Sequence, residues 1–292
     1  MRPRRQAFRR AVAAAEHGRF ALLVRRACCS ARRARAAPAK PQTLEPLSAR
    51  PQATIAGRGG GRSIPEENTA MSFFITLLET TDTSRREFEA IPKMTAMLNR
   101  GLSPAEYRAF LHDLYYVVWH FCPTMAAAAA RCDDRFRQVR YELYERIEEE
   151  KGHEMWVLDD LEAVGGDSAR VRSHLPSAPM QCMIAYNYFC AERAHPCAVL
   201  GMIYSLEVIA SAYAATLAQS IAKVLERNYE GPGFKFLLSH SAMDQTHVAK
   251  LNALVKTIAE REAQEAIVNA TRVNFYQFGR VFQEGGFTSL VA

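Results

Sequence analysis

Three separate stretches of the chain place carboxylate and imidazole groups at helical spacing. In the first stretch, Glu150 and His153 stand three positions apart. On one continuous helix this spacing puts both side chains on the same face, as a helical bundle requires to present them to one metal. Taken alone, the stretch is also typical of a solvated face, because glutamates crowd it. Gly152 favours a site or close packing, since glycine inside a helix costs about 1 kcal/mol.

The second stretch holds three titratable groups on one helical stripe. His240, Asp244 and His247 fall at positions i, i+4 and i+7 of an otherwise apolar segment. Burying three such groups is costly unless something compensates them, and a metal ion would do so. The alternative is a pair of surface histidines on an amphipathic face.

The third stretch is a single carboxylate in apolar surroundings. Glu207 has apolar or small neighbours for about two helical turns on each side. A carboxylate in such a helix needs a partner, or its pKa rises until it is neutral. One alternative to a metal is an arginine across a helix interface, and Arg193 is the nearest cation upstream.

Taken together, these residues indicate a metal site. Mixed carboxylate and imidazole ligation favours iron, with manganese as the competing metal, over structural zinc. Six candidate ligands exceed what one open iron site needs, so a dinuclear centre bridged by carboxylate is also consistent with the pattern.

The elements that must position these residues are predicted to be helices. Ser103, Pro104 and Glu106 combine an N-cap, a proline at the first helical position and a capping box. Pro123 is expected to kink or break the helix that they open. Further helices are expected at 134–163, 178–193, 197–226, 234–260 and 263–284, with stops at Gly165-Gly166 and His195-Pro196. Strand signals are almost absent, so we predict an all-α fold, a single bundle of about seven helices.

The first seventy residues differ in composition from the rest. Residues 1–70 carry fifteen basic and four acidic residues, a net charge of +11, and are rich in Arg, Ala, Pro and Gly without sustained periodicity. We expect a disordered leader there, either resembling a transit peptide or encoded upstream of a later true start near Met71. Residues 71–292 are expected to form the helical metal-binding domain.

Charge and cysteines limit the function classes. Outside the leader the net charge is −5, which gives little support to a nucleic-acid partner. We expect no stretch that approaches the roughly 20 uninterrupted apolar residues of a membrane span. Seven cysteines are an odd count; those after residue 120 lie in helix-like patterns, which indicates reduced core thiols and a cytoplasmic location.

The sequence resembles the haem-oxygenase-like diiron oxidases and oxygenases, iron-containing redox proteins related in fold to thiaminase II. The resemblance covers roughly residues 80–285 and rests on Glu-Glu-Lys-Gly-His-Glu followed by Leu-Asp-Asp-Leu, the isolated Glu207, and the final His-x3-Asp-x2-His. It implies that Glu150 and His153 match the family's Glu-x-x-His, that Glu207 is its mid-chain carboxylate, and that Asp244 and His247 are its last-helix pair. The arrangement with His240 is most similar to the N-nitrosating member.

The sequence departs from the family at one position. The family generally has a further Glu or His ligand on the preceding helix, and no Glu stands at the matching place. Asp113, Tyr116 and His120 share a face there, and His120 is the candidate ligand. A histidine on a largely apolar face is also often a satisfied core residue, so a mononuclear site stays open.

The resemblance implies an oxidoreductase that uses Fe(II), two ions per chain, and O2 to oxidise a small amine, amino acid or fatty-acid-like substrate, with an external electron donor. A homodimer is the candidate assembly. Three alternatives remain: a metal-free thiaminase-type hydrolase with Cys190 or Cys197 as nucleophile, a haem-binding protein with His153 or His247 as axial ligand, and a non-enzymatic scaffold.

Overall fold

The computed structural model of the protein describes residues 72–283, apart from the side chains of residues 244–246. Within this range the chain forms ten α-helices and two short 3-10 helices, and no strand. The leader expected over residues 1–70 lies outside the described residues. The α-helices are α2 (Phe73–Glu89), α3 (Pro92–Arg100), α4 (Pro104–Arg131), α5 (Arg137–Glu150), α6 (His153–Ala163), α7 (Ser168–Ser173), α8 (Ala178–Glu192), α9 (Val199–Val224), α10 (Lys235–Val255) and α11 (Arg261–Gln283), and the 3-10 helices are η1 (Asp134–Phe136) and η2 (Pro196–Ala198).

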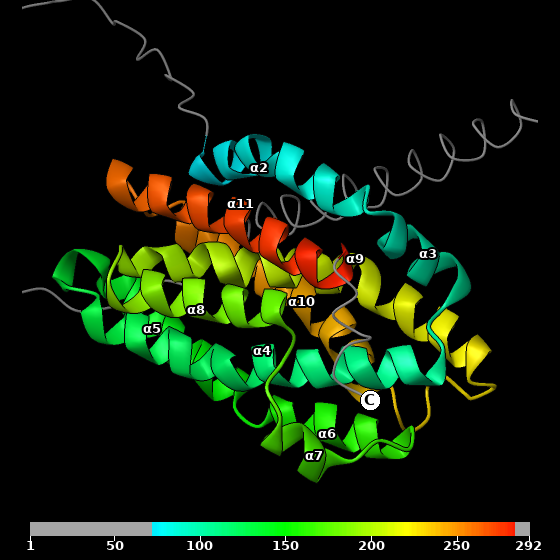
Figure 1. The fold of residues 1–292 in the computed structure, drawn as a ribbon. Coiled ribbons are helices and arrows are strands. Elements are labelled where there is room, and N and C mark those ends of the chain that lie inside the picture. The colour runs from blue at the N-terminus through cyan, green and yellow to red at the C-terminus, as the bar shows by residue number, and fades with distance from the viewer. Residues whose placement is uncertain (1–71, 284–292) are drawn as a thin grey trace, which may run out of the picture.

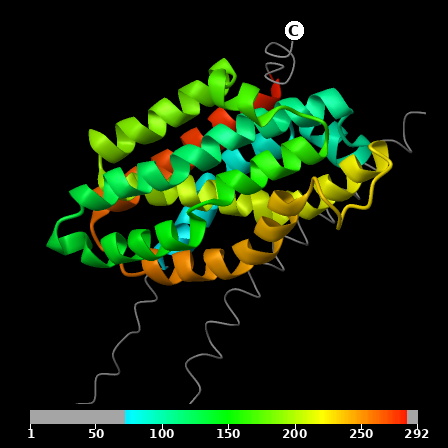
Figure 2. The same cartoon turned by 90° about the horizontal axis from the view of Figure 1, so that it is seen from below.

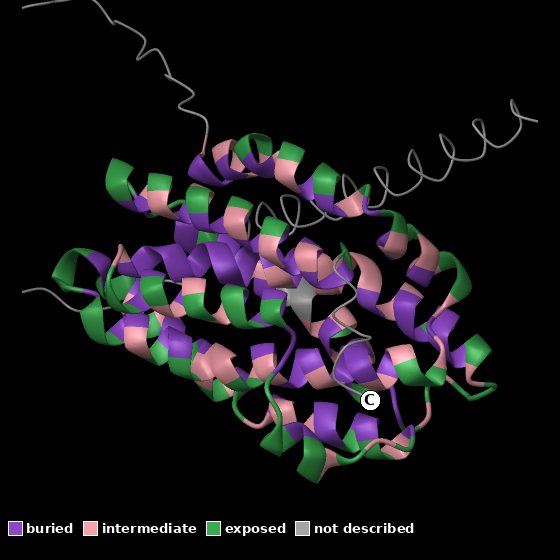
Figure 3. Ribbon diagram, in the orientation of Figure 1, coloured by how far each residue is buried: buried purple, intermediate pink, exposed green. Residues whose placement is uncertain are grey.

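Helix α9 is the central element of the bundle. It packs against α10 on one side and α11 on the other, while α4 contacts α5, α6, α8 and α9 (Figures 1 and 2). In Figure 3 much of the α9 ribbon carries the colour of buried residues. At Gly201 an added Cβ would lie 2.5 Å from the backbone oxygen of Ile267 on α11, so glycine is needed for the close approach of the two helices. The isolated Glu207 therefore lies on the most enclosed helix of the fold.

Several boundaries agree with the sequence signals. Ser103 and Glu106 form the expected capping box at the start of α4. Gly165 follows α6 with a φ of 79°, which is the left-handed conformation typical of a helix end. The break at His195-Pro196 separates α8 from η2 and α9. The all-α prediction is confirmed.

Of the predicted kink or break at Pro123, the break does not occur. Helix α4 continues through Pro123 to Arg131. The proline removes the backbone donor to the Trp119 carbonyl. The Thr124 hydroxyl donates to the neighbouring His120 carbonyl at 2.7 Å. Packing of α4 against α5, α6, α8 and α9 holds the segment helical despite the local cost.

One segment is more apolar than the sequence analysis expected. The segment Pro196–Val224 is long and apolar enough to span a membrane, although 72% of its most apolar window is buried inside the protein, as in a core helix. The expectation that no stretch reaches this level was therefore wrong, and the absence of a membrane partner stays a prediction.

Of the cysteines expected in the core, Cys132, Cys190 and Cys197 are buried, whereas Cys122 is half-buried and Cys182 exposed; none of these five forms a disulfide.

Candidate metal centre

The site begins at a break between two helices. Glu150 is the last residue of α5 and His153 the first of α6, so the single helix predicted over 134–163 is wrong. Gly152 adopts a φ of 89° between them, a left-handed conformation that favours glycine. The turn, rather than one helix face, brings the two side chains together, with His153 Nδ1 2.9 Å from Glu150 Oε2.

Substituting Gly152 by alanine is expected to weaken metal binding through the backbone alone. An added Cβ at Gly152 meets nothing within 4 Å, so the only cost is the left-handed φ, about 1–2 kcal/mol. Gly165→Ala is a matched control, since Gly165 also has a positive φ and open space around a Cβ. Thermal unfolding should show similar losses for both variants, while Mn(II) titration should show weaker binding for G152A alone. Equal metal affinities would contradict a role for this turn in the site.

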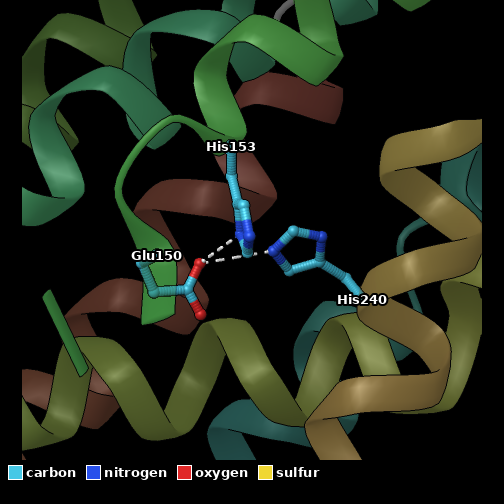
Figure 4. Close-up of side chains that lie close together, drawn as sticks. All are labelled: Glu150, His153 and His240. Carbon is cyan, nitrogen blue, oxygen red and sulfur yellow. Dashed lines mark hydrogen bonds and ion pairs between the residues drawn. The ribbon is translucent and has the colours of Figure 1, made fainter. Parts of the chain in front are cut away.

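Three buried side chains from α5, α6 and α10 converge on one point. Potential ligand atoms of Glu150, His153 and His240 all lie within 4.8 Å of one another. His240 Nε2 lies 3.5 Å from the same carboxylate oxygen that His153 contacts. Figure 4 shows both imidazole rings directed at the Glu150 carboxylate.

The position of His240 is fixed by the start of α10. Its Nδ1 lies 3.0 Å from the Phe236 carbonyl, which leaves Nε2 directed at Glu150. The Asp160 carboxylate accepts hydrogen bonds from the backbone N–H groups of Lys235 and Phe236 and so attaches this end of α10 to α6. Burial raises the pKa of Asp160, while these hydrogen bonds oppose the rise. The ring thus presents one defined nitrogen to the site, as expected of a metal ligand.

A second group of charged side chains adjoins the first. His247 Nδ1 lies 3.7 Å from Glu150 Oε1 and 3.7 Å from Glu207 Oε1. Glu207 also forms an ion pair with Arg146, whose side chain is 1% exposed. The arginine partner considered for Glu207 is therefore real, but it is Arg146 on α5 and not Arg193. Glu207 and His247 come together as the metal hypothesis requires.

The charge balance of this group suits a cation. Burial raises the pKa of Glu150, but hydrogen bonds and charges of His153 and His240 outweigh burial and hold this pKa well below its usual range. The carboxylate is therefore ionised and faces nitrogen atoms of three histidines, all in a buried setting. Buried charged groups of this kind are paired or coordinate metals. The donor set fits iron or manganese.

One predicted ligand, His120, lies away from the cluster, and the side chain of another, Asp244, is not among those that the structure describes. His120 lies at the interface of α4 with α8, where its Nδ1 is 3.0 Å from the Tyr188 hydroxyl; burial lowers its pKa. Its neighbour on the same face, Asp113, accepts hydrogen bonds from the backbone N–H and hydroxyl of Ser177, which explains its burial. Asp244 lies on α10, but its side chain is outside the described part of the structure.

An apolar cavity of about 120 Å³ reaches the charged cluster. Glu150, Glu207 and His240 line its polar end. Most of the remaining wall comes from α4 and α9 and is apolar, with Tyr213 as a further polar member: Phe110, Leu114, Val117, Val118, Phe121, Leu206, Ile209, Ala210, Ala214 and Leu217. The cavity can therefore place an apolar group beside the carboxylates.

Sequence reasoning missed two residues of the site. Arg146 stands four positions before Glu150, so helical spacing alone could have placed it beside that carboxylate. Glu149 lies 3.5 Å from His247 Nε2 and was hidden within the glutamate run. No local signal separated it from its exposed neighbours.

Comparisons with solved structures agree on the fold. A domain of unknown function with a heme oxygenase-like fold from Shewanella denitrificans has a TM-score of 0.66 at 20% identity, covering 72% of this chain and 90% of that chain. A TenA homolog from Pseudomonas syringae pv. tomato has a TM-score of 0.62 at 15% identity, covering 75% and 93%. Heme oxygenase-1 from the cyanobacterium Synechocystis, solved in complex with heme, has a TM-score of 0.57 at 17% identity, covering 73% and 91%.

Sequence comparison gives the family. No curated protein sequence matches the chain significantly. A family profile described as "iron-containing redox enzyme" matches residues 108–275, a range that includes Glu150, His153, Glu207, His240 and His247. The chain therefore belongs to the family of iron-containing redox enzymes and has a haem-oxygenase-like all-α fold.

Proposed function

We propose that the protein is a non-haem iron oxidoreductase that activates O2 to oxidise a small substrate. The observation that carries the proposal is the convergence of Glu150, His153 and His240 within 4.8 Å at the end of an apolar cavity. Carboxylate and imidazole ligands with open positions are typical of non-haem Fe(II) oxygenases. We propose a cytoplasmic protein with an external electron donor, no nucleic-acid or membrane partner, and a homodimer as its assembly.

Two irons per chain are the proposed complement. Glu150, His153 and His240 would hold the first, and Glu207 and His247, with Asp244 on the same helix, would hold the second. Glu150 has one oxygen near His153 and His240 and the other near His247, which is the placement expected of a bridging carboxylate. Iron bound there would supply one-electron and O2 chemistry.

The chain's own residues would position the substrate and exclude water. The walls from α4 and α9 accept an apolar group and leave the carboxylate end of the cavity as its main polar region. Among the small amines, amino acids and fatty-acid-like compounds considered as substrates, this lining favours those with a hydrocarbon chain. Apolar walls also keep the dielectric constant low, which strengthens the electrostatic effect of each charged ligand.

The alternatives have less support in the structure. A thiaminase-type hydrolase needs an activated thiol, but burial raises the pKa values of both Cys190 and Cys197. Neither cysteine lines the cavity that contains the carboxylates. Haem bound through His153 or His247 would place an apolar macrocycle beside Glu150 and Glu207, with both carboxylates then poorly compensated. A scaffold role gives no reason for the buried charges.

Anaerobic loading with Fe(II) tests this proposal. We expect about two irons per chain, a Mössbauer signal of high-spin non-haem iron, and O2 consumption faster than that of free Fe(II). Long-chain carboxylic acids and amines should increase the consumption more than free amino acids do. Less than one iron per chain after loading would overturn the proposal, as would a Soret band on haem addition with activity dependent on haem.

A further inference from the structure

The apolar cavity follows one face of α9. The residues of α9 that line it include Glu207, Ala210, Ala214 and Leu217, which recur every three or four positions, as residues on one helical face do. Glu207 and Leu217 are ten positions apart, which corresponds to about 15 Å along a helix axis. One end of this face therefore lies at the candidate metal centre, and the other end lies about 15 Å from it.

Helix α4 provides a second wall of the same length. Its lining residues extend from Phe110 to Phe121, which is about 16 Å along the axis. Near the charged end, Cys122 Sγ lies 3.9 Å from the carbonyl oxygen of Ile147, in the last turn of α5. At the other end, the ring of Phe110 lies 6.4 Å from that of Phe282, measured between centroids. The two helices thus line the cavity from its charged end to its apolar end.

Large apolar side chains form the end of the cavity that lies away from the metal centre. The Ser220 hydroxyl, near the end of α9, donates to the Met97 carbonyl of α3 at 2.9 Å, so this part of α9 lies against α3. On α11 the ring centroids of Phe278 and Phe282 are 5.2 Å apart. The buried lining residues at this end are Met94, Phe110, Leu217, Phe278 and Phe282. Because none of these five is polar, this end suits a methyl terminus.

The middle of the cavity presents hydrocarbon as well. Tyr213 is the polar residue among those that line this part of the described structure. Its hydroxyl donates to Glu89 on α2 at 2.6 Å, and Glu89 also pairs with Arg85. The volume of about 120 Å³ is small beside the roughly 300–1,000 Å³ of pockets for drug-sized ligands. The cavity therefore suits one unbranched alkyl chain.

Ala214 keeps the far part of this cavity open. It is buried and stands seven positions after Glu207, about 10 Å along the helix axis. Leu217 follows about one turn later. Ala210 and Ala214 are the small residues among those that line the cavity. A leucine side chain at position 214 would extend from the wall into the cavity and leave about 10 Å of its length accessible.

We propose that Ala214 determines the length of the alkyl chain that the cavity accepts. The polar head of the substrate lies at Glu150, Glu207 and His240, and its methyl end lies at Leu217. Carbon chains with bonds of about 1.5 Å and angles near 111° advance about 1.25 Å per carbon, so about 15 Å holds about 12 carbons. The role of the bound chain as substrate rests on the proposed function; the length limit does not.

Straight-chain primary alcohols measure this limit in the full-length, metal-free protein. Their neutral head group removes the charge of the metal centre from the comparison. Each additional buried methylene should strengthen binding about fourfold, up to about 12 carbons in the wild type and about eight in Ala214→Leu. Isothermal titration calorimetry should therefore show decanol binding about 16-fold more tightly than octanol to the wild type, and equally tightly to A214L.

Ala215→Leu is the matched control. Ala215 is the next residue on α9, is half-buried and is not among the residues that line the cavity. A215L should keep the chain-length limit of the wild type, and circular dichroism should show the same helix content in both variants. The same limit in folded A214L and the wild type would overturn the proposal. Equal affinities of octanol and decanol for the wild type would also overturn it, whether or not A214L folds.

Iron loading separates this proposal from the proposed function. If the alcohols show the expected chain-length dependence but the wild type binds no iron, the length limit stands and the proposed iron function fails. If the wild type binds iron and consumes O2 but shows no chain-length dependence, the proposed function stands and the role of Ala214 is wrong.

Discussion

Glu150→Gln is expected to remove metal binding and with it O2 consumption. The substitution keeps the shape of the side chain but removes the charge that faces His153, His240 and His247. Because outer partners of metal ligands already change affinity 10–100-fold, loss of the central ligand should reduce it about 100-fold or more. Mn(II) titration and metal analysis after anaerobic Fe(II) loading measure the change.

Glu145→Gln serves as the control for this experiment. Glu145 lies on the same helix and is exposed, so its metal content and O2 consumption should equal those of the wild type. Circular dichroism should show that E150Q retains the helical fold. A correctly folded E150Q that still binds iron like the wild type would contradict the assignment of Glu150 as the central ligand.

Of the substitutions proposed for this protein, Arg146→Gln is expected to lower the free energy of unfolding most. Arg146 is one of the largest fully buried side chains and pairs with both Glu142 and Glu207. Removing one partner of a buried ion pair leaves an uncompensated charge and costs about 3–5 kcal/mol. For a domain of this size the melting temperature should fall by about 6–20 °C in the metal-free protein.

Metal binding should partly rescue this variant. In the wild type a metal ion must share the Glu207 carboxylate with the Arg146 guanidinium or displace the guanidinium from it. In R146Q no guanidinium competes with the metal ion for this carboxylate. Saturating Mn(II) should therefore raise the melting temperature of R146Q by more than that of the wild type. Equal increments would contradict the idea that arginine and metal are alternative counterions for Glu207.

Arg137→Gln is the control for the arginine substitution. Arg137 pairs with Asp134, and both side chains are at least half exposed. Such surface pairs contribute about 0–1 kcal/mol, so differential scanning calorimetry should show little change with or without metal. A loss in R137Q equal to that in R146Q would show that burial of the pair is not the cause.

Much of the fold was predictable because its signals are local. The capping box at Ser103 fixes the start of α4 through contacts within one turn, and Gly165 ends α6 through its own φ. A break of α4 at Pro123 did not occur, because helix packing outweighs the local cost of the proline. The helix over 134–163 was wrongly predicted to be continuous, although glycine disfavours a helix interior and the left-handed Gly152 separates α5 from α6.

The amino-acid sequence by itself determined which groups could not be buried alone. Glu207 and the pair His240 and His247 lie among apolar residues, and the high cost of burying them uncompensated made their convergence predictable without coordinates. Only the tertiary structure decided which partners they meet: Arg146 at Glu207, Glu149 at His247, and Tyr188 at His120. Which partner each side chain contacts depends on how α5, α8 and α10 pack against their neighbours. The sequence does not show this, because helical periodicity predicts the helix face on which a residue lies but not which helix packs against that face.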